Sequence, residues 1–138
     1  MTFFIGLAMV LAVYGDAVSE LRPVIKEVAT QNGLDPVLME AIIRQESGNA
    51  TSHAARTKNN LAGIMGRKGQ RTYASKEECI RHLGSILVNY RAKGRVTVAQ
   101  IAKAYCQARS VWIRRVNGFM GQIRDGRWGD ISLYDTAK

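Results

Sequence analysis

Glu46 is the residue whose surroundings point most directly to chemistry. It lies in the segment Gln45-Glu46-Ser47-Gly48-Asn49, and no further acidic residue occurs before Glu77 and Glu78. A Gly- and Asn-containing turn, residues 59–66, follows it. A lone carboxyl group at a helix end beside such a turn is typical of a glycosidase with one dominant proton donor. A general acid of this kind must keep its proton near the working pH.

The helix expected to carry Glu46 begins at Asp35-Pro36, with Asp as N-cap and Pro at the first helical position. The apolar residues Met39, Ile42 and Ile43 lie one turn before Glu46 on the same side. A carboxyl group beside an apolar face loses water contacts, which disfavours its charged form. The sequence therefore predicts a raised pKa for Glu46.

Four further helices and one irregular segment complete the predicted order of elements. The expected helices run from Asp16 to a left-handed end at Asn32-Gly33, from the capping box at residues 75–78 through Tyr90, from Thr97 through Tyr105, and from Ser110 through Ile123. Residues 48–74 lack helical periodicity, and their glycines predict turns and a small hairpin. The sequence thus predicts helices with an irregular insert.

Several short motifs, in this order, resemble glycoside hydrolase family 73. They are Glu46-Ser47-Gly48, Asn59-Asn60-Leu61-Ala62-Gly63-Ile64, Tyr73-Ala74-Ser75 and Ala104-Tyr105-Cys106. Members of that family are peptidoglycan N-acetylglucosaminidases of the lysozyme-like superfamily. Lytic transglycosylases share the Glu-Ser pair and a turn to which Ala62-Gly63-Ile64-Met65 is similar. The resemblance covers roughly residues 34–124.

The resemblance implies a mainly α, lysozyme-like helical domain with a small irregular or β-hairpin insert, and a cleft for a peptidoglycan strand. Glu46 would be the catalytic acid and base, no cofactor or metal would be needed, and substrate-binding residues would line the cleft. Those residues are Ser47, Asn60, Gly63, Ile64, Met65, Tyr73 and Tyr105.

The chain departs from the family pattern in two ways. Asn49-Ala50 stands where the family commonly has Trp-Gly, and the second acid of the insert has no obvious counterpart. Standard retaining and inverting glycosidases use two carboxyl groups, about 5–5.5 Å or about 6.5–9.5 Å apart. Glu77 is the candidate second acid, since Glu78 belongs to the capping box, and Asp125 and Asp130 are more distant. If none serves, the substrate must supply the nucleophile, through its 2-acetamido oxygen as in a hydrolase or its 6-hydroxyl as in a lytic transglycosylase.

The positive charge is concentrated in the middle and later parts of the chain. The 138 residues carry a formal net charge of +9, but residues 47–124 alone hold fifteen basic and two acidic side chains. Such a surface attracts polyanions, including acidic cell-wall polymers, or is simply solvated. No zinc spacing, ribonucleoprotein motif or helix-turn-helix pattern supports a nucleic-acid partner. The alternatives to an enzyme are a non-catalytic wall- or membrane-binding module and a basic nucleic-acid binder.

Residues 1–15 form a separate apolar segment, and residues 16–138 are expected to form the catalytic domain. The segment is either an export or anchoring sequence or a helix packed on the domain or a partner. It is the candidate for association with a membrane, a virion or a secretion complex. The expected location is the cell envelope, periplasmic or membrane-associated, or a virion. Cys79 and Cys106 are a candidate disulfide in an oxidising compartment.

Overall fold

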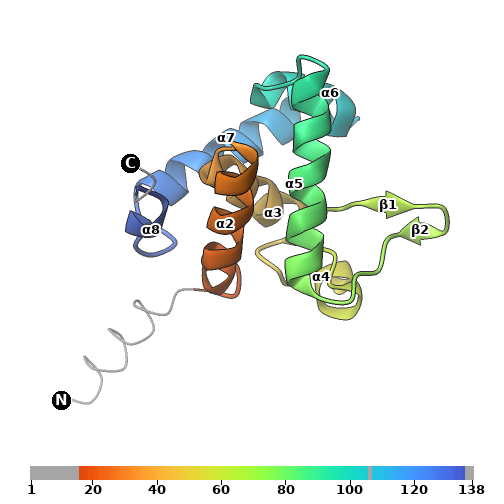
Figure 1. Ribbon diagram of the computed structural model, residues 1–138, viewed down its shortest axis with the longest axis horizontal. Helices are drawn as coiled ribbons and strands as arrows, with labels where there is room; N and C mark the ends of the chain where they lie inside the picture. The colour runs from red at the N-terminus through yellow and green to blue at the C-terminus, as the bar shows by residue number, and fades with distance from the viewer. Residues whose placement is uncertain (1–15, 106, 136–138) are drawn as a thin grey trace.

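The computed structural model describes residues 16–105 and 107–135, which are mainly helical (Figure 1). In chain order the elements are η1 (Ser19–Leu21), α2 (Arg22–Asn32), α3 (Pro36–Ser47), α4 (His53–Lys58), β1 (Met65–Gly66), β2 (Gly69–Gln70), α5 (Lys76–Ala92), α6 (Val98–Tyr105), α7 (Arg109–Arg124) and α8 (Ser132–Asp135). The apolar segment 1–15 and Cys106, with the predicted disulfide, lie outside the described residues. None of the described helices is long and apolar enough to cross a membrane.

Most predicted helix ends are confirmed, because the capping residues act as expected. The Asp35 side chain accepts a hydrogen bond from the Val37 amide, and Gly33 takes the left-handed conformation with φ 65°. Ser75 accepts from the Glu78 amide, and the Glu78 carboxylate accepts from the Ala74 amide. Thr97 and Gln100 cap the start of α6 in the same reciprocal way. These local pairings fix where the helices begin.

Other predicted boundaries are wrong. Asp16 accepts from the Ser19 amide at the 3₁₀ turn η1, so α2 begins only at Arg22. Helix α7 begins at Arg109, and its N-cap Ala108 makes no side-chain cap, so Ser110 is already inside the helix. The short helices α4 and α8 were not predicted, because neither is long enough to display a helical period.

The predicted hairpin is present and is very short. Strands β1 and β2 pair antiparallel, with Met65 opposite Gln70 and Gly66 opposite Gly69, and Arg67-Lys68 form the tip. Figure 1 shows the hairpin extending away from the helices. Its base therefore forms one edge of the helical body.

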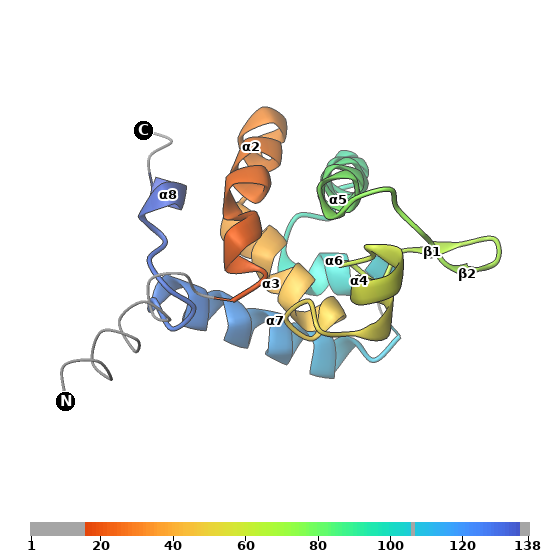
Figure 2. The same cartoon turned by 90° about the horizontal axis from the view of Figure 1, so that it is seen from below.

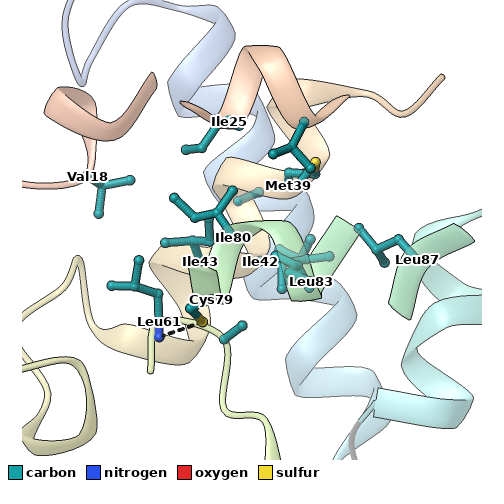
Figure 3. Close-up of a cluster of buried hydrophobic side chains, with 14 of the residues drawn as sticks. Val18, Ile25, Met39, Ile42, Ile43, Leu61, Cys79, Ile80, Leu83 and Leu87 are labelled. Carbon is teal, nitrogen blue, oxygen red and sulfur yellow. Dashed lines mark hydrogen bonds between the residues drawn. The ribbon is translucent and has the colours of Figure 1, made fainter. Parts of the chain in front are cut away.

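Helix α3 is central to the packing. It packs against α2 on one side and α7 on another, and α2 also packs against α5 (Figure 2). Figure 3 shows side chains of α2, α3 and α5 meeting in one apolar cluster, joined by Leu61 from the turn after α4. Met39, Ile42 and Ile43 are completely buried there. The apolar face predicted beside Glu46 is thus the face that enters the core.

A buried ionic network fixes the other side of α3. The Glu40 carboxylate accepts two hydrogen bonds from Arg22, one from Arg44 and one from the Tyr134 hydroxyl, all between 2.6 and 2.9 Å. Arg44 also binds Asp16 and stacks over the Trp128 ring. Burial alone would raise the pKa of Glu40, but the hydrogen bonds from Arg22 and Tyr134 outweigh it and lower the pKa. The ionised carboxylate therefore stabilises the fold above the usual glutamate pKa, and this contribution disappears as the pH falls through the lowered value.

We expect Gly84→Ala to destabilise the protein, since a β-carbon at Gly84 would lie 2.5 Å from Cγ1 of Val28 where α5 meets α2. Overpacking of this kind costs about 1–3 kcal/mol. Gly121→Ala is the matched control, because nothing lies within 4 Å of the added carbon and alanine favours a helix by roughly 0.5–1 kcal/mol. Urea unfolding measures both changes, and equal stabilisation by the two variants would contradict the close approach of α2 and α5.

Glu40→Gln should lower the free energy of unfolding by about 3 kcal/mol, because it leaves the buried Arg22 without its carboxylate partner, while Arg44 keeps Asp16. Glu27→Gln is the comparison: the Glu27–Arg81 pair is about half exposed, with side chains 49% and 51% accessible. Its loss should cost less than about 1 kcal/mol. Similar midpoints in urea for the two variants would show that the Glu40 network contributes little.

Candidate active site

Glu46 lies in the last turn of α3, where the helix ends at Gly48 in the left-handed conformation, φ 57°. The same helix buries Glu40 and the apolar residues of the core on its other faces. The Glu46 side chain is half-buried. Packing of α3 on α2 and α7 therefore determines where this carboxyl group points.

Two neighbours hold the Glu46 carboxyl group. The indole N–H of Trp112, on α7, donates a hydrogen bond of 2.6 Å to Oε1. On the other side, a β-carbon built at Gly63 would lie only 2.7 Å from Oε2. Gly63 also has φ 64°, which glycine adopts without strain. Position 63 thus needs glycine both for the turn and for the approach to the carboxyl group.

The pKa of Glu46 is raised, as the sequence predicted. Burial is the main cause, and the hydrogen bond from Trp112 opposes it without cancelling it. The group therefore holds its proton to a higher pH than an exposed glutamate. With Oε1 accepting from Trp112, Oε2 beside Gly63 is the oxygen free to carry the proton.

Asn60 builds the turn that faces Glu46. Its amide nitrogen donates to the carbonyl oxygens of Ile64 and Arg71, and its Oδ1 accepts from the amides of Ala62 and Ile64. The side chain is buried and every one of these bonds is local. Asn60 consequently positions Gly63 and does not itself face a ligand.

Tyr105 joins this turn to Trp112. Its hydroxyl donates to the carbonyl oxygen of Ala62, and its ring stacks on Trp112 with centroids 5.4 Å apart. Burial, with the Glu46 charge second, raises the pKa of Tyr105 well above the usual value, so the hydroxyl remains protonated. Tyr105 is thus brought to the site as the sequence suggested.

A pocket of about 440 Å³ extends from this point. It is lined by Gly63, Ile64, Met65, Ile86, Asn89, Tyr90, Lys93, Ala104 and Tyr105. Gly63 and Tyr105 thus border both the pocket and the surroundings of Glu46. Its lining residues come from the base of the hairpin, the second half of α5 and the end of α6, and Figure 1 labels these elements.

Besides Asn60, two more of the predicted substrate residues, Ser47 and Tyr73, lie outside the pocket lining. Ser47 is buried, and its hydroxyl donates to the Ile43 carbonyl and accepts from the Ala50 amide, so it shapes the loop after α3. The Tyr73 hydroxyl bonds Nδ1 of His82 at 2.6 Å, and burial raises the pKa of Tyr73 to about 12. Neither residue lines the pocket.

Glu77 is not brought to the pocket. It is exposed in the first turn of α5, whereas the pocket-lining residues of that helix begin at Ile86. Nine residues of helix span about 14 Å. The described lining residues include no carboxylate, and Glu46 itself is linked to the pocket through Gly63, which lines it and lies against Oε2.

Other chemistries find no support in the geometry. Cys79 is a buried free thiol whose sulfur accepts from the Leu61 amide (Figure 3), while His82 is engaged by Tyr73. These contacts leave the two side chains without the arrangement of a nucleophile and its base. The described residues contain no cluster of His, Cys, Asp or Glu able to hold a metal ion.

Sequence reasoning missed Trp112 as the partner of Glu46 and missed the α5 side of the pocket. Trp112 is 2% exposed, and an apolar pattern in the sequence gives no sign of where an indole N–H points. Ile86, Asn89, Tyr90 and Lys93 did carry a signal, since their spacing puts them on one helix face.

No protein-family model, curated protein or solved structure matches this chain.

Trp112→Phe should raise the pKa of Glu46 further, because it removes the hydrogen bond that favours the carboxylate and leaves the burial. The titration of the Glu46 carboxyl carbon by ¹³C NMR measures the shift. Trp128→Phe is the control, since Trp128 bonds Gln122 and stacks on Arg44. A lower pKa in Trp112→Phe would contradict the assigned role of this hydrogen bond.

Proposed function

We propose that this protein cleaves the glycan strand of peptidoglycan at a β-1,4 bond between N-acetylmuramic acid and N-acetylglucosamine, with Glu46 as general acid and base. The observation that carries the proposal is the Glu46 carboxyl group itself. It is half-buried, has a raised pKa, and is held between Trp112 and Gly63, of which Gly63 also lines a pocket. The resemblance of the motifs around it to family 73 and to lytic transglycosylases supplies the substrate class.

The first step would be proton transfer from Oε2 of Glu46 to the glycosidic oxygen, with cleavage of the bond to the anomeric carbon. Trp112 fixes Oε1 and so sets the direction of the proton. Placing an acid in this way contributes about 10²–10⁴-fold to a rate. Tyr105 acts indirectly, by holding the Ala62–Gly63 turn against the acid.

The candidate second acid, Glu77, lies exposed in the first turn of α5, away from the pocket-lining part of that helix, and this favours a nucleophile supplied by the substrate. In a hydrolase, the 2-acetamido oxygen would attack the anomeric carbon, and the Glu46 carboxylate would then take a proton from the incoming water. In a lytic transglycosylase, Glu46 would take the proton of the 6-hydroxyl as that oxygen closes an anhydro ring. Both routes return Glu46 to its protonated form.

A lysozyme-like fold is part of the same proposal. It is supported by a helical body with a small hairpin at one edge and an acid at the end of a buried helix. The protein would act at the cell envelope or as part of a virion. The basic surface would favour acidic wall polymers over neutral ones.

Digestion of purified peptidoglycan, followed by mass spectrometry, tests the proposal. We expect wild type to release fragments and Glu46→Gln to release them at least about 100-fold more slowly. Glu77→Gln is the matched control and should keep the wild-type rate, since that carboxyl group lies away from the pocket.

The sugar ends of the released fragments identify the type of reaction. Anhydro-muramic ends indicate a lytic transglycosylase, and reducing N-acetylglucosamine ends indicate a glucosaminidase. Reducing muramic ends would indicate a muramidase. A folded wild type that releases nothing would contradict the enzymatic function and leave a binding module or a nucleic-acid binder.

A further inference from the structure

Lys93 is the charged residue among the described side chains that line the pocket. The others are apolar, amide or phenolic, so the charge inside the pocket is positive. Lys93 is exposed, and no hydrogen bond or ion pair joins its ammonium group to another residue in the described ranges 16–105 and 107–135. An ammonium group with no protein partner remains available to a ligand.

The placement of Lys93 follows from the helix that carries it. Ile86, Asn89 and Tyr90 line the pocket at positions i, i+3 and i+4, and Lys93 continues the same face at i+7. It is the C-cap residue of α5, so its backbone marks the end of that stripe. The stripe extends over about 10 Å of helix. A ligand that lies along it would meet Lys93 at one end.

The neighbouring cations point elsewhere. Arg91 donates to the carbonyl oxygens of Asn32 and Gly33, at 2.7 and 3.1 Å, and thereby ties α5 to the end of α2. Both Arg91 and Arg95 line a different pocket, on the side of Leu34 and Leu38. Lys93 alone of these three lines the pocket next to Glu46.

We propose that Lys93 binds a carboxylate carried by the muramic acid substituent of the glycan strand, and so selects anionic strands over neutral chitin-type strands. This inference rests on the proposed function and specifies its substrate. Asn89, on the same helix face, can add a neutral hydrogen bond from its amide group. The carboxylate has two sources: the lactyl group of a peptide-free strand, or the peptide of a substituted strand.

Equilibrium binding tests the proposal without turnover. In a Glu46→Gln background, calorimetry compares three ligands: chitotetraose, a peptide-free muramyl tetrasaccharide and the same tetrasaccharide bearing its peptides. We expect Lys93→Gln to weaken binding of a carboxylate ligand about five- to tenfold and to leave chitotetraose unchanged. The ligand that responds identifies the source of the carboxylate.

Two further variants are the controls for this comparison. Lys93→Arg should retain the affinity, because it keeps the charge. Lys103→Gln removes the same charge from an exposed position of α6 that does not line the pocket, and should have no effect. The response to Lys93→Gln should also shrink as salt is added, because exposed charges are screened.

Equal losses in Lys93→Gln and Lys103→Gln, or an equal loss for chitotetraose, would overturn the inference while leaving the proposed function intact. If no ligand binds and wild type also releases no fragments from peptidoglycan, the proposed function fails and the inference fails with it.

Discussion

The Glu40 carboxylate, buried between two arginines, is the constraint on which the arrangement of this protein depends. Removing a carboxylate from water is costly unless charged partners and hydrogen bonds replace the water. Arg22, Arg44 and Tyr134 provide four such bonds, and they come from α2, α3 and α8. The position and rotation of α3 are therefore fixed from both sides, by this network and by the apolar core. A helix that could rotate would leave Glu40 unpaired.

The fixed position of α3 in turn determines the surroundings of the Glu46 carboxyl group. Its raised pKa arises from burial, which requires α7 and the Asn60 turn to close around the end of α3. Trp112 and Gly63 are the contact residues, one from each of these elements. The two carboxyl groups of α3 thus have opposite environments. The cations around Glu40 lower its pKa, while Glu46, which accepts from the neutral indole of Trp112, has a raised pKa and holds its proton to a higher pH.

How much could be predicted from the sequence depends on whether the deciding interaction is local. The ends of α3 and α5 follow from Asp35 and Ser75, each of which bonds an amide two or three residues away. The rise in the pKa of Glu46 followed from the apolar residues one turn earlier. By contrast, Trp112, which donates a hydrogen bond to Glu46, lies 66 residues further along the chain, and the sequence pattern around Trp112 does not indicate this contact. Ser47 and Tyr73 were assigned to the substrate by resemblance, but their hydroxyl groups are used within the fold.

The hydrogen bonds around Glu40 join residues that are far apart in the sequence, and this affects how the protein unfolds. Tyr134 is 94 residues from Glu40, and Ser19 bonds the Trp128 carbonyl across 109 residues. Segments near the two ends of the described chain, which in most domains fray first, are here tied to the middle of the most buried helix. Local opening of α8 would remove the hydrogen bond that Tyr134 donates to the buried Glu40 carboxylate. We therefore expect α8 to open only when the core unfolds. Hydrogen exchange at both segments would then follow global unfolding, and folding would wait for a contact of long sequence separation.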